Sequence, residues 1–116
     1  MITEDYVSFE TAKLLKEKGF NGDFTKAYST NGTLISNFTE NCIIAPTNQM
    51  AMKWLKEYHC LFIDIELLSG PSFSWYIWFM NDPKNMMGCS EDYMNYYDSY
   101  EEACEAAIQY CLKNLI

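Results

Sequence analysis

The chain has 116 residues, of which 49% are hydrophobic and 16% aromatic, and its formal net charge is −8. This composition is too apolar for a disordered chain, and the length suits one domain over residues 1–116. The sequence contains no arginine and one histidine, which removes bidentate arginine contacts to phosphate and leaves few groups for acid–base catalysis. We therefore expect a folded domain that is not an enzyme.

The negative charge is concentrated in the second half of the chain. Residues 1–56 carry six acidic and six basic side chains, whereas residues 57–116 carry ten acidic side chains against Lys84 and Lys113. A negative field repels phosphate backbones and anionic membranes, so we expect neither a nucleic acid nor a membrane as partner. The same field favours a cationic partner or simple solubility.

The cellular location follows from the terminal segment and the cysteines. The first residues lack the basic and apolar regions of a secretory signal, and no apolar run approaches the roughly 20 residues that cross a bilayer. The five cysteines have no short paired spacing, which suits reduced thiols and provides no zinc-binding pattern. We expect a cytoplasmic protein with no metal and no cofactor.

The first predicted elements are a helix and a hairpin. Ser8 can cap a helix over residues 7–20, and Gly19 can end it in the left-handed conformation. Asn31-Gly32 tolerates positive φ at both positions and favours a two-residue turn. The pattern thus predicts two strands, over 24–29 and 33–38.

A second helix follows an extended segment. Residues 42–45 precede Pro46, which disfavours helix for the residue before it, so we expect a short extended lead-in. The helix begins near Thr47. Its apolar stripe contains Met50, Ala51, Trp54, Leu55 and Tyr58.

Two strands and a helix complete the chain. Residues 61–68 alternate, with Leu61, Ile63, Ile65 and Leu67 on one face and Asp64 and Glu66 on the other. Residues 73–80 carry large apolar side chains on both faces, which favours a central strand covered on both faces. Ser99 and Glu102 fit a capping box at the start of the last helix, whose apolar positions include several small residues.

The predicted order is α-β-β-α-β-β-α. Short turns make both strand pairs antiparallel, and the one-sided helices need a shared surface. The expected fold is a single α+β domain with a four-stranded, mainly antiparallel sheet packed by helices.

Three stretches carry a resemblance to known sequences: residues 14–20, residues 45–55 and residues 99–108. Together they resemble a group of short uncharacterised proteins from gut anaerobic bacteria and their phages and mobile elements. The resemblance implies a mobile-element context and supplies no catalytic residues. It leaves residues 81–98 uncovered.

The segment 81–98 is the main candidate for a partner-binding site. At about 18 residues it exceeds the usual length of a loop in a compact domain, and such loops are often functional. Tyrosine and methionine are enriched at protein interfaces. The alternative is that these side chains simply cover one end of the sheet. The residues concerned are Met86, Met87, Tyr93, Met94, Tyr96 and Tyr97, with Glu91 and Asp92.

Two further groups have competing interpretations. Tyr76 and Trp78 could stack nucleobases, but the acidic field disfavours phosphate, so a core or dimer contact is preferred. Asp64 and Glu66 share one strand face and could act as an acid–base pair, although an exposed strand face is the simpler interpretation.

The leading hypothesis is a non-catalytic protein-interaction module, with a phage or mobile-element accessory protein as the setting that the resemblance implies. A protein partner or self-association is expected. One alternative is a small hydrolase-like enzyme that uses carboxylates such as Asp64 and Glu66. Another is an inhibitor that presents Glu91, Asp92 and Asp98 in place of DNA phosphates.

Overall fold

A computed structural model describes residues 5–36, 41–68, 72–90 and 96–116 of the chain. The helices are α1 (Phe9–Glu17), α2 (Asn48–His59) and α3 (Tyr100–Tyr110), and α3 continues into a π-helical segment, Cys111–Leu115. The strands are β1 (Lys26–Tyr28), β2 (Leu34–Ile35), β3 (Ile43–Ala45), β4 (Leu61–Leu67), β5 (Phe73–Phe79) and β6 (Asp82–Cys89).

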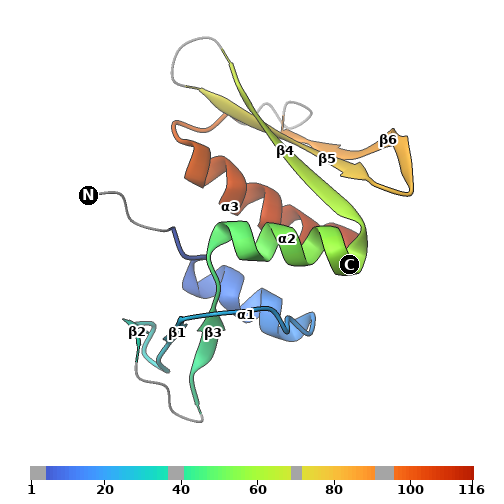
Figure 1. The fold of residues 1–116 in the computed structure, drawn as a ribbon. Helices are drawn as coiled ribbons and strands as arrows, with labels where there is room; N and C mark the ends of the chain where they lie inside the picture. Colours follow the sequence, from blue (N-terminus) through green and yellow to red (C-terminus); the bar gives the residue numbers. More distant parts are fainter. Residues whose placement is uncertain (1–4, 37–40, 69–71, 91–95) are drawn as a thin grey trace.

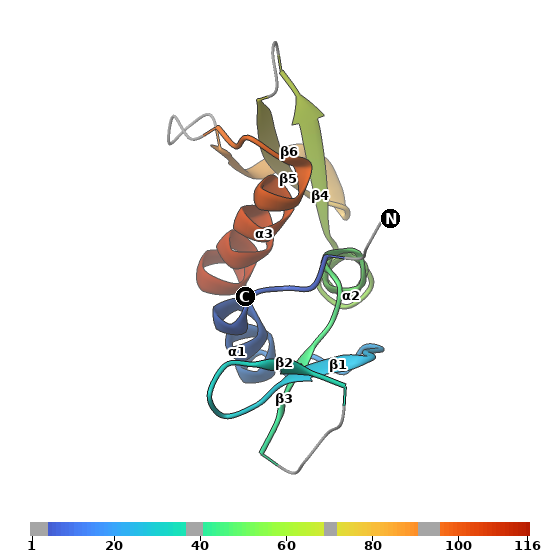
Figure 2. The ribbon, with the colours of Figure 1, turned by 90° about the vertical axis from the view of Figure 1, so that its left-hand side faces the viewer.

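The strands form two antiparallel sheets rather than one. Their orders are β2-β1-β3 and β4-β5-β6, and the three helices lie between the two sheets (Figure 1). Figure 2 shows the same arrangement from the side, with the small sheet and the large sheet at opposite ends. The α+β class is confirmed. The single four-stranded sheet is wrong, because α2 follows β3 directly and carries the chain across the helical layer before β4 begins.

Each sheet gains a strand that the sequence pattern did not predict. Residues 43–45, expected only as part of a short extended lead-in, form β3 and pair with β1 in the register Lys26↔Ala45 and Tyr28↔Ile43. Residues 82–89, expected within a long loop, form β6. β5 is therefore central in the larger sheet, as predicted, but the expected cover on both faces is wrong, because Trp78 on its outer face is only half-buried.

The predicted starts of the helices are confirmed by their hydrogen bonds, but the first helix covers Phe9–Glu17 rather than residues 7–20. The hydroxyl oxygen of Ser8 accepts from the Thr11 amide at 3.2 Å, and that of Thr47 accepts from the Met50 amide at 3.2 Å. Ser99 accepts from the Glu102 amide at 3.1 Å. These caps supply acceptors to amides that lack a partner in the first turn.

The predicted hairpin turn differs in type. The Gly32 amide donates to the Ser29 carbonyl at 3.0 Å, and the Ser29 amide donates to the Thr33 carbonyl at 2.8 Å. Gly32 has φ +84°, and among the described residues Asn31 is not one of those with positive φ. The loop is thus a three-residue turn that ends in a left-handed glycine, and the two-residue turn is wrong.

One apolar cluster joins the helices to the larger sheet. Six residues on one side of the last helix are fully buried: Ala103, Cys104, Ala107, Ile108, Cys111 and Leu112. Of these, Ala107, Ile108, Cys111 and Leu112 pack with Leu55 of α2, Ile77 of β5 and Leu15 of α1. Two predicted core positions are wrong, since Tyr58 is 62% exposed and Leu67 63% exposed near the ends of their elements. No helix in the described part of the chain is both long and apolar enough to cross a membrane.

Candidate partner-binding surface

The larger sheet presents a row of apolar side chains on the face turned away from the helices. Phe62 of β4 lies opposite Trp78 of β5, and Trp78 lies opposite Met86 of β6. Phe62 is 45% exposed, Met86 is 43% exposed and Trp78 is half-buried. We call Phe62, Trp78 and Met86 the outer row.

Strand alternation and a bulge together create the outer row. Leu61, Ile63 and Ile77 point to the helices and are buried, so their neighbours Phe62 and Trp78 point away. The register between β5 and β6 shifts between Ile77 and Trp78, which places Met86 opposite Trp78. A bulge of this kind redirects side chains at a strand edge.

Two carboxylates extend the same face beyond the outer row. Asp64 and Glu66 follow Phe62 at alternate positions of β4, opposite Tyr76 and Ser74, and both carboxylates are exposed. A catalytic pair normally needs a sheltered site that shifts its ionisation. The exposed strand face expected for Asp64 and Glu66 is confirmed, and the two carboxylates place negative charge beside the outer row.

The predicted site residues fall into separate environments. Met86 and Met87 lie on β6 rather than in a loop, and Met87 is 39% exposed. Tyr96 is 55% exposed. Tyr97 pairs with Phe73 through two backbone hydrogen bonds of 2.7 and 2.9 Å. Four predicted residues lie outside the described residues: Glu91, Asp92, Tyr93 and Met94.

The structure therefore joins Trp78 to Met86 and separates both from Tyr97. The Tyr97 hydroxyl is 3.4 Å from Nε1 of Trp75, and the residue packs against the core. Tyr97 thus fits the alternative in which the aromatic side chains cover the sheet. Phe62 was missed, although the alternation that placed Asp64 and Glu66 on the outer face places Phe62 there as well.

Comparison with protein-family models, curated proteins and solved structures found no match to this chain. The surface is therefore interpreted from its own residues. The resemblance to short proteins of gut bacteria and phages stays a prediction.

Apart from the outer row, the structure has an acidic cleft between residues 5–8 and α3. It has a volume of about 530 Å³, and its lining includes Asp5, Glu101, Glu102 and Glu105. Asn48, which is 6% exposed, also lines it, and its Oδ1 has no hydrogen-bond partner among the residues that the structure describes. Within the described residues, no three His, Cys, Asp or Glu side chains are placed to hold a metal ion.

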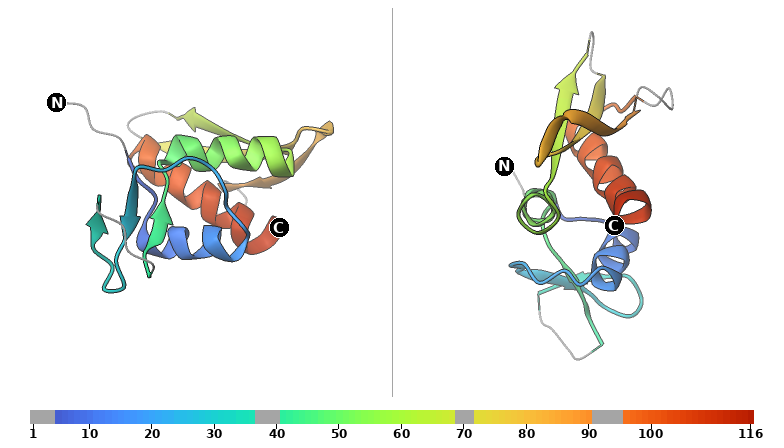
Figure 3. Two further views of the ribbon diagram at one scale, coloured as in Figure 1. Left: turned by 60° about the horizontal axis from the view of Figure 1, so that its bottom comes forward. Right: turned by 90° about the vertical axis from the view of Figure 1, so that its right-hand side faces the viewer.

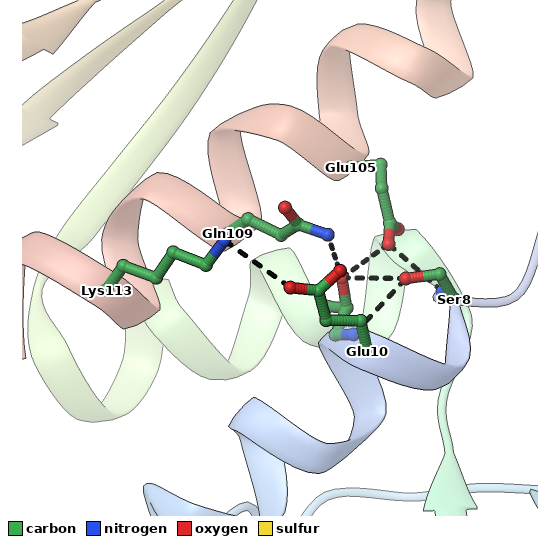
Figure 4. A network of polar contacts seen from close by, with 6 residues as sticks. Ser8, Glu10, Glu105, Gln109 and Lys113 are labelled. Atoms are coloured by element: carbon green, nitrogen blue, oxygen red, sulfur yellow. Dashed lines mark hydrogen bonds and ion pairs between the residues drawn. The ribbon is translucent and has the colours of Figure 1, made fainter.

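Glu105 of α3 holds the start of α1 in place through hydrogen bonds (Figure 4). Its Oε1 accepts from the Ser8 amide at 3.0 Å and from the hydroxyl of the fully buried Thr11. Gln109 donates to the Thr11 hydroxyl oxygen at 2.9 Å. Beside it, Nζ of Lys113 forms an ion pair with Oε1 of Glu10 at 3.6 Å. The pKa of Tyr28 is raised mainly by burial, and the negative charge of Glu105 raises it further. This network is a structural clamp.

The histidine and the buried thiols are packed in the core or against it. The His59 ring lies edge-on to Trp54, with 4.7 Å between ring centres. Burial raises the pKa of Cys104 to about 11 and that of Cys111 to about 12. A raised pKa disfavours the thiolate, which is the nucleophilic form. Neither thiol has the environment of a reactive cysteine.

Proposed function

We propose that this protein is a non-catalytic protein-interaction module that binds its partner through the outer row and the carboxylates beside it. The observation that carries the proposal is a contiguous row of large apolar side chains across three adjacent strands, exposed at Phe62 and Met86 and half-buried at Trp78. Single exposed apolar residues are ordinary on protein surfaces, but a contiguous group is typical of an interaction site.

The chemistry of the outer row fits a protein contact. Aromatic residues and methionine are enriched at interfaces, where they give large contact area and adaptable packing. Phe62 and Trp78 lie on regular strands with uninterrupted pairing from Leu61 to Leu67. A surface on paired strands is already ordered, so binding loses less conformational entropy there than on a loop.

The charge beside the outer row favours a basic partner over a second copy of the chain. Asp64 and Glu66 are exposed on the same face, and the net charge of −8 makes copies repel one another. A partner with lysine or arginine around an apolar centre would complement this surface. A phage or mobile-element accessory role is the setting that the resemblance suggests for such a module.

Capture followed by reconstitution tests this proposal. Tagged protein is used to capture partners from an extract of the cells that produce it, and the partner is then purified and its affinity measured. A Trp78→Ser/Met86→Ser variant should lose most of the affinity. Phe24→Ser, which removes a side chain of similar exposure (40%) near the small sheet, is the matched control. Equal affinity for both variants would overturn the proposal.

A further inference from the structure

The β4 strand has an open edge. β4 is the terminal strand of its sheet, and among the described residues no strand pairs with it on the side away from β5. The Met80 amide donates to the Cys60 carbonyl at 2.8 Å, and the Leu68 amide donates to the Ser72 carbonyl at 2.7 Å. Hydrogen-bonded pairs alternate in an antiparallel ladder, so even-numbered residues of β4 bond to β5. The open edge therefore presents the backbone groups of Leu61, Ile63, Ile65 and Leu67.

The opposite edge of the same sheet is protected. β6 contains Pro83 and Lys84, and its register with β5 shifts twice, between Ile77 and Trp78 and between Trp78 and Phe79. Proline, lysine and bulges are the usual means of preventing strand addition. β4 has none of these features over its seven residues, and all seven pair in one register with β5. Of the two edges, β4 is the one suited to receive a strand.

A groove runs beside the open edge of β4. It has a volume of about 320 Å³ and is lined by Gln49, Met52, Lys53 and Lys56 of α2 and by Phe62 and Ile63 of β4. No β5 residue is among the lining residues, so the groove lies on the side of β4 away from β5. Figure 3 (right) shows α2 end-on beneath β4.

A second copy of this chain fits the edge poorly. If two β4 strands paired antiparallel over their full length, Asp64 would lie opposite Asp64 of the other copy. A shift by two residues in one direction would place Asp64 opposite Glu66. Like charges directly opposite each other destabilise a strand pair. The same carboxylates would stabilise a strand with positive side chains at those positions.

We infer that the β4 edge accepts an extended basic segment of the partner protein as an added antiparallel strand. This inference rests on the proposed function and specifies the kind of partner. Side chains of the added strand opposite Asp64 and Glu66 are basic, and the one opposite Phe62 is aromatic. Side chains on the other face lie over the groove, where Lys53 and Lys56 disfavour further positive charge, and they are therefore apolar. Read from its amino end, the added strand has the pattern basic, apolar, basic, apolar, aromatic.

A synthetic peptide with the core Lys-Val-Lys-Val-Phe, flanked by threonines, tests the inference. Its affinity is compared with that of a Glu-Val-Glu-Val-Phe peptide for wild-type protein and for an Asp64→Lys/Glu66→Lys variant. Wild type should prefer the basic peptide, and the variant the acidic peptide, each by on the order of tenfold, since two cross-strand charge pairs change sign. Amide hydrogen exchange is followed in the same complexes.

Exchange separates strand addition from simple charge attraction. Strand addition should slow exchange of the Leu61, Ile63, Ile65 and Leu67 amides on basic-peptide binding. Charge-dependent binding without this protection would overturn the inference, as would binding of neither peptide. The proposed function would survive either result if the Trp78→Ser/Met86→Ser variant still lost the natural partner. A dimer whose contact protects the same amides would overturn the inference in favour of self-pairing.

Discussion

Phe62 and Trp78 lie directly opposite each other on β4 and β5, on the face of the sheet turned away from the helices. Their neighbours Ile63 and Ile77 form the matching pair on the inner face and are buried. The same two strands thus serve packing on one side and present an aromatic pair on the other. This division between the faces predicts that the two pairs respond differently to substitution.

Phe62→Thr should leave stability nearly unchanged. The side chain is 45% exposed, and losing one cross-strand contact costs at most about 1 kcal/mol. Ile77→Ala, at a fully buried position, should cost about 2–5 kcal/mol because it opens a cavity in the core. Urea unfolding followed by tryptophan fluorescence measures both. If Phe62→Thr destabilised the protein as much as Ile77→Ala, the outer row would be part of a core.

Glu105→Ala should destabilise the protein by about 1–3 kcal/mol. It removes the acceptor used by the Ser8 amide and by the buried Thr11 hydroxyl, and an unsatisfied buried donor carries roughly that penalty. Glu57→Ala, at an exposed position of α2, is the control and should stay within about 0.5 kcal/mol of wild type. Equal effects in chemical denaturation would mean that the clamp between α1 and α3 contributes nothing.

Gly88→Ala should destabilise the larger sheet where it meets α3. A Cβ at this position would lie 2.6 Å from Cε1 of the Tyr110 ring, which itself packs against Trp75. Forcing the ring to move typically costs about 1–3 kcal/mol. In a Tyr110→Leu background the same substitution should cost clearly less, because the obstructing ring atoms are gone. Fully additive effects in thermal unfolding would refute the close approach.

Stability should fall at alkaline pH partly through Cys111. Burial raises the pKa of this thiol from its ordinary value of 9.0 to about 12, so the folded chain keeps a proton that the unfolded chain releases. The stabilisation that comes from keeping this thiol protonated is fully present below pH 9 and is lost as the pH rises from 9 to about 12. Cys111→Ala should lose stability less steeply in this range. Identical slopes of unfolding free energy for wild type and Cys111→Ala would contradict the assignment.

The local features of the fold could be predicted because they depend on neighbouring residues. Ser8, Thr47 and Ser99 each accept from an amide three residues away, and such caps are visible as short sequence patterns. β6 depends on a partner strand for its hydrogen bonds and contains Pro83, Lys84 and Gly88, which give no strand signal on their own. β3 is three residues long, too short for a period to appear.

The candidate surface was predictable only in parts. Trp78 and Met86 both appeared as candidates, but in different groups, because their adjacency depends on the register shift in β6. The open edge of β4 follows from the strand order, which a single sequence does not specify. The positions of the charged residues were easier to predict than the contact between Trp78 and Met86. Asp64 and Glu66 lie exposed on one strand face, as the alternation along residues 61–68 predicts.

Site-specific crosslinking tests the central claim most directly. Photoreactive benzoylphenylalanine is placed at Trp78 in one variant and at Phe24 in another, and each variant is irradiated in an extract of the producing cells. We predict covalent capture of one protein partner from position 78 and none of that partner from position 24. Capture of the partner from position 24 alone, or of a second copy of this chain from position 78, would contradict the account.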